Sequence, residues 1–328
     1  MTTAALIGCG DVSTVHFEAL REIDDIELIG VYDRDPDAAI RAARTYGGRV
    51  YNSSDAVLAA QPDVLHITTP HDQHTHLVLK AIEAGVHVLQ EKPLAHSIAE
   101  GQKIVDAAAD ASVKVGVCFQ NRYNVSSQQL RRLLDDGSLG NIYGSYSSVV
   151  WTRNDGYYSD KPWRGQKERS GGGLLMNQAI HTLDLVQWFL GEVVDVSGKV
   201  STDKYGEIID VEDTAHAYLT HDTGLHTSFY GTLTAPRHRP VELELDCENA
   251  YVILRDGLEV QWNDGTVDRY EERRAPSGGR SYWGVSHELL IRDFYSKLDD
   301  DEPFWISPEE ALKSLSIAQA IYASSNSN

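Results

Sequence analysis

The chain has 328 residues, of which 41% are hydrophobic and 24% are charged, and its net charge is −20 at pH 7. A chain of this length usually forms two domains, and this composition is that of a folded globular protein. The negative charge repels nucleic-acid phosphates and anionic membrane surfaces, so we expect neither nucleic acid nor a membrane as a partner.

The cysteines and the N-terminal sequence give an indication of the cellular compartment. Cys9, Cys118 and Cys247 are widely spaced, which indicates neither a disulfide framework nor a zinc cluster. The N-terminal sequence MTTAALIGCG enters a strand at once, and no apolar run approaches the roughly 18 residues of a membrane span. We therefore predict a cytoplasmic protein.

The first third of the chain alternates strand-like and helical stretches. The strands are AALIG, IELIGVYD, VLHITTP and HVLQEKP, and helices are predicted to begin at about Ser13, Pro36 and Gln73. A helix over about 98–109 and the strand VKVGVCFQNRY continue the series. This alternation is typical of βαβ units on a parallel sheet, so residues 1–121 are predicted to form a doubly wound domain.

The remaining residues, 122–328, have a different pattern. A helix over about 126–135 leads into long stretches with period-2 alternation, in which RDGL and NDGT have the chemistry of hairpin turns. Further helices are predicted over 173–190, about 286–298 and 308–324. The pattern predicts a second α/β domain with a large, mostly antiparallel sheet.

A glycine pattern follows the first strand. Gly8 and Gly10 permit a tight turn that brings the backbone close to a pyrophosphate, which would then lie at the positive end of the helix from Ser13. Alone the pattern is weak, and a plain turn is the alternative. Asp33 ends the second strand, where a carboxylate accepts hydrogen bonds from an adenosine ribose and repels a 2′-phosphate, which favours NAD over NADP. Arg34 keeps NADP use open.

Lys92 follows the strand that ends in VHVLQ. It is therefore predicted at the carboxyl edge of the parallel sheet, where doubly wound folds bind ligands. An exposed lysine at a strand end is the alternative. Pro93 restricts the backbone beyond Lys92, and Glu91 could orient the ammonium or pair with it. These neighbours favour a positioned ammonium.

Four stretches, GCGDVSTVH, TTPHDQH, AGVHVLQEKPLA and GGGLLMNQAIHTLDLVQWFLG, occur in this order along the chain. Together they resemble the Gfo/Idh/MocA family of oxidoreductases, and the resemblance extends over the full chain. It implies a Rossmann domain followed by an α/β domain whose open sheet packs against a neighbouring subunit, in a homodimer or homotetramer. It also implies an active site between the two domains.

By resemblance, Lys92 contacts both cofactor and substrate and assists hydride transfer between a sugar or cyclitol carbinol and the nicotinamide. His181 would then be the general acid or base. The chemistry agrees, because an imidazole with a pKa of about 6.5 exchanges protons near neutrality and an ammonium favours a developing alkoxide. A buried core histidine is the alternative for His181.

Asn177, His181 and Asp184 are spaced by four and three residues, so they are predicted to share one face of a helix. Many family members have an aspartate where this chain has Asn177. An amide takes up no proton, so the carboxylate that would partner His181 is absent unless Asp184 or another group replaces it. Asn177 is grouped with Lys92 and His181 as a predicted catalytic residue that hydrogen-bonds substrate hydroxyls, and Asp184 is expected to anchor the helix or orient His181.

The sequence TTPHDQHTH contains His71, His74 and His76, whose spacing does not place all three on one helix face, so no metal site is predicted. The resemblance instead has Thr69, Pro70 and His74 line the cofactor pocket. The full set of predicted cofactor-binding residues is Gly8, Gly10, Asp11, Val12, Asp33, Arg34, Thr68, Thr69, Pro70, His71, His74, Glu91, Lys92 and Gln120.

A loop before the His181 helix contains Trp163 and Arg164, which could stack on a sugar ring and clamp a polyhydroxy ligand. Surface loop is the alternative. The predicted substrate-binding residues are Lys92, Arg122, Trp163, Arg164, Asn177 and His181, with Arg237, His238 and His287 as weaker candidates from HRPVELE and SYWGVSHELLIRDF.

We therefore predict an NAD-dependent dehydrogenase of a sugar, cyclitol or sugar derivative. Two alternatives are left open. One is an NADPH-dependent reductase of a ketone, imine or dihydrodiol, and the other is a dinucleotide- or sugar-binding protein without turnover, which the amide of Asn177 would suit.

Overall fold

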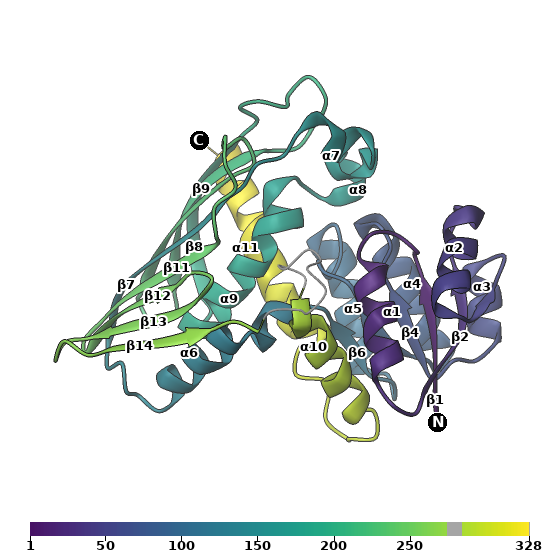
Figure 1. Ribbon diagram of the computed structural model, residues 1–328. Helices are drawn as coiled ribbons and strands as arrows, with labels where there is room; N and C mark the ends of the chain where they lie inside the picture. The colour runs from purple at the N-terminus through teal and green to yellow at the C-terminus, as the bar shows by residue number, and fades with distance from the viewer. Residues whose placement is uncertain (274–283, 328) are drawn as a thin grey trace. The chain divides into compact units, whose positions relative to one another are not determined.

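The computed structural model describes residues 1–273 and 284–327 (Figure 1). These residues divide into two compact units. The first contains residues 1–120 and 284–312, and the second contains residues 121–273 and 313–327. The division predicted from the sequence, 1–121 and 122–328, differs from these units chiefly in residues 284–312, which pack with the first unit.

The first unit is built on a six-stranded parallel sheet with the strand order β3-β2-β1-β4-β5-β6. Its central strands are continuous apolar runs because a parallel sheet is covered on both faces; the side chains of Val64, Leu65 and Ile67, for example, are 0% exposed. The strands are β1 (Thr2–Ile7), β2 (Ile26–Tyr32), β3 (Arg49–Val50), β4 (Val64–Ile67), β5 (His87–Gln90) and β6 (Val115–Val117).

The helices of the first unit begin at polar caps. The side chains of Asp35, Ser53 and Ser97 accept hydrogen bonds from backbone N–H groups in the first turns of α2, α3 and α5. The helices are α1 (Ser13–Glu22), α2 (Pro36–Tyr46), α3 (Ser54–Ala59), α4 (His74–Glu83), which follows the 3-10 helix η1 (His71–Gln73), α5 (Ile98–Ala109) and α10 (Gly284–Ser296). The helices predicted from Ser13, Pro36 and over 98–109 are confirmed, whereas β3 and α3 were not predicted.

The chain returns to the first unit through α10, which packs against α1. Phe294 of α10 and Phe304 beyond it are buried, with their rings perpendicular and 5.2 Å apart. The N–H of Val117 in β6 donates to the carbonyl of Ile306 at 3.1 Å. The edge of the parallel sheet is thus completed by a segment almost 200 residues later in the sequence.

The second unit contains an eight-stranded sheet with the order β14-β13-β12-β11-β7-β10-β9-β8. Only the β7–β10 pair is parallel, and the hairpins predicted at RDGL and NDGT join β12 to β13 and β13 to β14. The strands are β7 (Ile142–Val150), β8 (Val193–Ser201), β9 (Thr214–His221), β10 (His226–Thr232), β11 (Glu242–Cys247), β12 (Ala250–Leu254), β13 (Gly257–Trp262) and β14 (Val267–Glu271). The predicted fold class, a Rossmann domain followed by an α/β domain with a mostly antiparallel sheet, is confirmed.

One face of this sheet is covered by helices α6, α9 and the C-terminal part of α11 (Figure 1). The helical elements of this part of the chain are η2 (Gln120–Tyr123), α6 (Val125–Asp135), α7 (Asp155–Ser159), η3 (Pro162–Gly165), α8 (Lys167–Ser170), η4 (Leu175–Ala179), α9 (Ile180–Leu190) and α11 (Pro308–Asn326). Tyr143 and Tyr218 of the sheet are 68% and 47% exposed. Among the described residues, no helix is both long and apolar enough to span a membrane.

The prediction of one α-helix over 173–190 is wrong in its first part. Residues Leu175–Ala179 form a π-helix, and the α-helix begins at Ile180. The three-and-four spacing used to place Asn177 on one face with His181 and Asp184 assumed α-helical geometry, so it does not apply across this junction. A π-turn inside a helix is frequent at functional sites.

Candidate active site

The turn after β1 brings the first and second strands together with the end of β4. Gly8 has a φ of 101°, and its N–H donates to the carbonyl of Tyr32 at 2.8 Å. A Cβ atom at Gly8 would lie 2.7 Å from the carbonyl carbon of Thr68, so only glycine fits. Around Gly10 nothing lies within 4 Å of the corresponding position, which leaves the backbone at the start of α1 approachable. Asp11 is exposed and Val12 partly buried beside it.

The carboxylate of Asp33 is fixed at the end of β2. Its Oδ2 accepts from the N–H of Cys9 at 2.6 Å, and its Oδ1 accepts from the N–H of Asp35 at 2.7 Å. The first bond ties this carboxylate to the glycine turn, and Arg34 next to it is exposed. A carboxylate held in this place suits the ribose diol of a dinucleotide.

The segment after β4 packs on the glycine turn. The hydroxyl of Thr68 donates to the carbonyl of Gly8. Among the described residues, the Thr69 hydroxyl and the Gln120 side-chain oxygen are buried polar atoms with no hydrogen-bond partner. Buried polar groups are normally satisfied, so these two atoms fit a site that receives a polar ligand. Pro70, partly buried, leads from Thr69 into η1.

The imidazole of His74 lies between two loops of the site. Its ring nitrogens are 2.9 Å from the carbonyl of Pro93 and 3.1 Å from the carbonyl of Thr69. The ring is fully buried, and this burial lowers its pKa. His74 therefore holds the loop after β4 to the loop after β5, and its direct contact with a cofactor stays a prediction. His71, on η1, is also buried.

Lys92 directly follows β5, at the same edge of the sheet as the glycine turn and Thr69. The lysine side chain is partly buried, and the Lys92–Pro93 peptide bond is cis. The backbone N–H of Lys92 donates to Oε2 of Glu91 at 3.3 Å. This bond goes to the backbone of Lys92, so the predicted pairing of Glu91 with the lysine ammonium stays a prediction.

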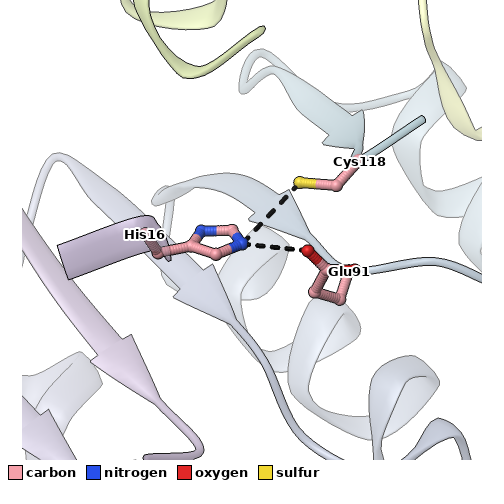
Figure 2. Close-up of side chains that lie close together, drawn as sticks. All are labelled: His16, Glu91 and Cys118. Atoms are coloured by element: carbon pink, nitrogen blue, oxygen red, sulfur yellow. Dashed lines mark hydrogen bonds and ion pairs between the residues drawn. The ribbon is translucent and has the colours of Figure 1, made fainter. Parts of the chain in front are cut away.

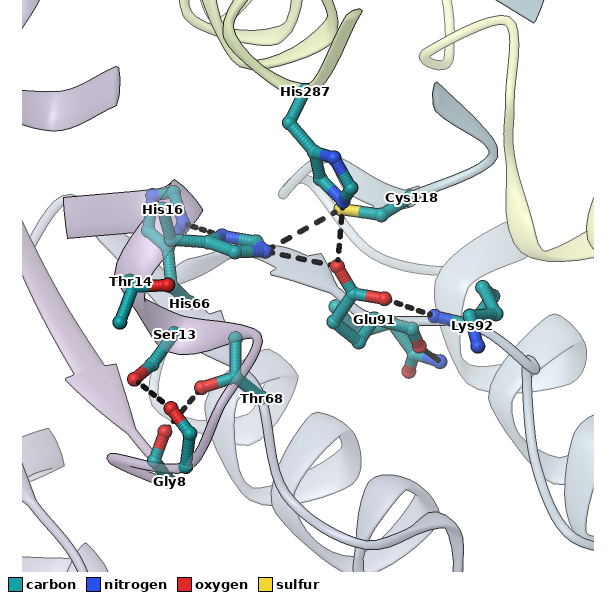
Figure 3. Close-up of polar contacts among 12 residues, drawn as sticks. Gly8, Ser13, Thr14, His16, His66, Thr68, Glu91, Lys92, Cys118 and His287 are labelled. Carbon is teal, nitrogen blue, oxygen red and sulfur yellow. Dashed lines mark hydrogen bonds and ion pairs between the residues drawn. The ribbon is translucent and has the colours of Figure 1, made fainter. Parts of the chain in front are cut away.

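Glu91 is the centre of a buried polar cluster that the sequence did not predict. Its Oε1 lies 3.1 Å from His16 Nε2 and 3.2 Å from His287 Nε2. Figure 2 shows His16 Nε2 facing both Glu91 and Cys118, whose sulfur is 4.0 Å away. Figure 3 shows the wider group, in which Nδ1 of His16 is 2.8 Å from Nδ1 of His66. These side chains come from α1, β4, α10 and the ends of β5 and β6.

The carboxylate of Glu91 determines which nitrogen of each imidazole carries the proton. Glu91 accepts, so the neutral His16 ring donates from Nε2 and accepts at Nδ1 from His66. His66 Nε2 then accepts from the hydroxyl of Tyr295 at 2.9 Å. Burial lowers the pKa of both His16 and His66, which keeps the rings neutral. Burial alone would raise the pKa of Glu91, but the bonds from His16 and His287 outweigh it and hold that pKa well below its usual value.

In the second unit, the candidate residues Asn177 and His181 lie on the π-helix and α9, which follow a glycine turn. The side-chain amide of Asn177 donates to the carbonyls of Gly172 and Gly173 at 3.2 and 3.1 Å. His181 lies in the first turn of α9 and is partly buried. Asn177 thus ties the π-helix to the turn before it, and its predicted contact with substrate stays a prediction.

A buried carboxylate holds the same turn from the other side. Glu212 accepts from the N–H of Gly173 and of Leu175, both at 2.8 Å, and from the hydroxyl of Tyr322 at 2.8 Å. A Cβ on Gly173 would lie 1.9 Å from the carbonyl oxygen of Glu212, so this approach requires glycine. Burial raises the pKa of Glu212 in spite of these three donors.

Arg122 and Asp184 form a buried ion pair inside the second unit. The guanidinium donates from Nε and Nη2 to the two carboxylate oxygens at 2.8 and 2.7 Å, and the two side chains are 1% and 0% exposed. The prediction that Asp184 anchors the helix agrees with this bidentate pair. The guanidinium of Arg122 bonds Asp184 and lies over the ring of Trp188, so it is held by contacts within the second unit. Its predicted contact with substrate stays a prediction.

The other substrate candidates, Trp163 and Arg164, and the weaker ones, Arg237, His238 and His287, lie on different elements. Arg164, in η3, has its guanidinium 4.4 Å from the ring centre of Tyr157, and Trp163 beside it is partly buried. His238 stacks on Trp151 at 4.7 Å, and Arg237 is exposed. His287 is buried against Glu91 in the first unit. Residues 281–283, at the start of SYWGVSHELLIRDF, lie outside the described residues.

The sequence analysis did not select His16, His66, Cys118 or Glu212. A signal existed for the histidines, since His66 interrupts the apolar run of β4 and His16 falls three residues after Ser13, on the face of α1 that is buried. No comparable signal marks Glu212, because its partners lie far from it in the sequence.

Two family models match the chain. One is described as the oxidoreductase family with an NAD-binding Rossmann fold and matches residues 2–119, and the other, the GFO/IDH/MocA C-terminal domain, matches residues 127–253.

Named relatives extend this result. The chain is 31% identical to D-apiose dehydrogenase of Paraburkholderia graminis and 30% identical to glucose-6-phosphate 3-dehydrogenase of Bacillus subtilis, over 67% and 66% of its length. These alignments cover 58% and 64% of the two relatives, less than two thirds of either. Among solved structures, the WlbA dehydrogenase of Bordetella pertussis in complex with NADH and UDP-GlcNAcA is 30% identical, with a TM-score of 0.86 over 99% of this chain and 96% of that one.

Proposed function

Because this chain belongs to the Gfo/Idh/MocA family of oxidoreductases, we propose that it is an NAD-dependent dehydrogenase of a sugar, cyclitol or sugar-derivative carbinol. The observation that carries the proposal is the position of Lys92, which follows β5 at the same sheet edge as the glycine turn and Thr69. This is the edge where doubly wound sheets bind their ligands. The named relatives, which are sugar dehydrogenases, support the substrate class.

Bound NAD supplies the hydride acceptor, and the chain's own residues handle the charge and the proton. As hydride leaves the carbinol carbon, the hydroxyl proton must also leave. We assign its removal to the imidazole of His181, and stabilisation of the developing alkoxide to the ammonium of Lys92. Since Asn177 is an amide and Asp184 bonds Arg122, the imidazole has to accept this proton without a carboxylate from either residue.

Asp33 supports NAD over NADP. Two backbone N–H groups hold its carboxylate in place, so it cannot easily turn away from a 2′-phosphate. The negative carboxylate of Asp33 and a negative 2′-phosphate would repel each other. The neighbouring cation, Arg34, is exposed to solvent. We expect dinucleotide titrations to give tighter binding of NAD than of NADP; equal affinities would remove Asp33 as the discriminating residue.

Oligomer formation belongs to the same proposal. Tyr143 and Tyr218 expose large aromatic rings on the sheet of the second unit. Aromatic side chains are enriched at subunit interfaces, which supports a homodimer or homotetramer formed through this sheet. Light scattering of the purified protein measures the number of subunits, and a monomer at micromolar concentration would contradict this part of the proposal.

The central test is Lys92→Met, with Lys103→Met as the matched control because Lys103 is on the surface of α5 and 58% exposed. We expect Lys92→Met to lose at least about 100-fold in kcat, as when a group that stabilises developing charge is removed, while NAD affinity changes little. NADH formation is followed with a panel of sugars and polyols, and NAD binding by fluorescence titration. Retained turnover in Lys92→Met would remove the lysine from the mechanism.

One observation favours a second candidate, a dinucleotide- or sugar-binding protein without turnover. The amide of Asn177 donates to backbone carbonyls and takes up no proton. This candidate predicts that sugars raise the affinity for NAD while no member of the panel is oxidised. Reduction of ketones or imines with NADPH in the same panel would indicate the reductase instead.

A further inference from the structure

We propose that His16, Glu91, Cys118 and His287 form a structural site for a divalent transition metal ion of the zinc class inside the first unit. The proposal depends on these side chains alone, so it stands or falls separately from the dehydrogenase activity. The set consists of two imidazoles, one carboxylate and one thiol, all of which zinc accepts as ligands.

Three ligand atoms already face one another. His16 Nε2, Glu91 Oε1 and Cys118 Sγ lie within 4.8 Å of one another, and all three residues are buried (Figure 2). Ligand atoms about 2.0–2.3 Å from a tetrahedral ion are separated by roughly 3.3–3.8 Å. The distances from His16 Nε2 to Glu91 and to Cys118, 3.1 and 4.0 Å, bracket that range.

We assign the fourth ligand to His287, which lies beside this group of three. Its Nε2 is 3.2 Å from the same oxygen of Glu91, and it approaches from α10 (Figure 3). With His287 the set reaches four protein ligands, which describes a closed structural site and not a catalytic one that keeps an open position. All four residues are at most 4% exposed.

The groups behind the ligands are those that metal sites use. His66 contacts Nδ1 of His16 at 2.8 Å, and the N–H of Lys92 contacts Oε2 of Glu91, the oxygen away from the site, at 3.3 Å. Such outer partners fix the orientation of a metal-bound imidazole or carboxylate. Tyr295 extends the chain beyond His66.

Hydrogen bonds account for the two imidazoles but not for the thiol. Both imidazole contacts of Glu91, at 3.1 and 3.2 Å, have ordinary N–H···O lengths. The sulfur of Cys118 lies 4.0 Å from His16 Nε2, whose proton is already donated to Glu91. A shared ion explains why four ligand side chains from four elements converge there.

Binding has a defined proton balance. The thiol of Cys118 loses its proton to solvent when the sulfur coordinates. The Nε2 protons of His16 and His287 move to the Nδ1 atoms of their own rings. His16 then donates to Nδ1 of His66, whose own proton moves to Nε2 and is donated to the oxygen of Tyr295. Because His287 is on α10 and the other ligands lie on α1 and at the ends of β5 and β6, the ion would join α10 to the parallel sheet.

Cobalt substitution tests the site directly. The full chain is produced in minimal medium with Co2+ as the added transition metal, and surface-bound ions are removed with a chelator under native conditions. We expect one ion per chain by elemental analysis, together with a thiolate-to-cobalt charge-transfer band and the intense visible bands of tetrahedral Co2+. Cys118→Ser should abolish the charge-transfer band, whereas Cys247→Ser, the matched control in the second unit, should retain it.

Two further measurements complete the test. His66→Gln should weaken metal affinity by about 10–100-fold, the usual effect of removing an outer partner. Preparations from zinc-supplemented medium should retain zinc through the same chelator treatment. Folded wild-type protein that carries neither metal nor the cobalt bands would overturn the proposal, even if Cys118→Ser fails to fold. It would leave the cluster a hydrogen-bonded network.

Discussion

Glu91 in the first unit and Glu212 in the second are buried carboxylates close to candidate catalytic residues, and they are held differently. Glu91, beside Lys92, contacts the imidazoles of His16 and His287. Glu212, at the turn before the Asn177 and His181 helices, is bonded by two backbone N–H groups and a tyrosine hydroxyl. The pKa of Glu91 lies well below its usual value, whereas burial raises the pKa of Glu212.

The difference shows that the number of donors does not decide the charge state of a buried carboxylate. Each carboxylate has three donors, but two of those around Glu91 are imidazole N–H groups, whose bonds outweigh the effect of burial. Around Glu212 the donors are two backbone N–H groups and a hydroxyl, and desolvation dominates. The loop that carries Lys92 is therefore anchored by an ionised group, and the turn before His181 by a group that favours its proton.

The largest stability effect is expected in the second unit, at its buried ion pair. Arg122→Met leaves the carboxylate of Asp184 buried without its bidentate partner, and removing one member of such a pair lowers the free energy of unfolding by about 3–5 kcal/mol. Urea unfolding measures the change. The double variant Arg122→Met, Asp184→Leu should recover most of the loss, because apolar replacements leave no buried charge. A loss of under about 1 kcal/mol in the single variant would show that water reaches the pair.

Glu212→Gln tests the raised pKa and should lower the free energy of unfolding by about 1–3 kcal/mol at acidic pH, since one of the donors then faces an amide nitrogen. The folded pKa of Glu212 exceeds the unfolded value of about 4.3, so its stabilising contribution is full below that pH and is lost as the pH rises through the folded pKa. Glutamine does not titrate. The stability difference between wild type and variant should therefore shrink as the pH rises.

Urea unfolding at several pH values measures this difference. Tyr322→Phe is the companion variant: it removes one donor from Glu212 but keeps the carboxyl group, so the pH dependence should remain. A gap between wild type and Glu212→Gln that widens with pH would mean that the carboxylate is stabilised in the fold, as Glu91 is, and the contrast between the units would disappear.

Asn177→Asp tests what the side-chain amide of Asn177 contributes to the turn before the His181 helix. The amide donates to the carbonyls of Gly172 and Gly173, and a carboxylate would face both oxygens without a donor. We expect the free energy of unfolding to fall by about 1–2 kcal/mol. Asn154→Asp is the matched control, because asparagine and aspartate are equivalent at an N-cap. Equal stability of wild type and Asn177→Asp would show that residue 177 turns towards solvent or ligand instead.

Much of the fold could be predicted because its signals are local. Glycine follows the first strand, helices begin at capped positions such as Ser97, and RDGL and NDGT form the hairpins of the second sheet. The return of residues 284–312 to the first unit had no local signal, since it depends on contacts such as that between Val117 and Ile306. The π-helix was also missed, because three-and-four spacing does not distinguish it from an α-helix.

In the candidate site, too, the residues with local sequence signals were predicted and their long-range contacts were not. Gly8, Asp33 and Lys92 were found from their positions at strand ends, and the structure places them at one edge of the parallel sheet. The contacts that hold them were not predictable, because the partners of Glu91 lie 75 and 196 residues away in the sequence. A short motif selects a candidate residue, whereas the contacts around that residue come from the whole unit.

The smallest expected effect compares helix caps in the two units. Ser97 accepts from the N–H of Glu100 at the start of α5, immediately after the Lys92 loop, and Asn154 accepts from the N–H of Tyr157 at the start of α7. Replacement of either Ser97 or Asn154 by alanine should lower the free energy of unfolding by about 1 kcal/mol.

The two variants should differ in local order, because α5 has 12 residues and packs against α4, whereas α7 has 5 residues and depends more on its cap. Hydrogen exchange should therefore accelerate over residues 155–159 in Asn154→Ala and stay nearly unchanged over α5 in Ser97→Ala. Faster exchange throughout α5 would show that the helix behind the Lys92 loop is held by its cap and not by packing.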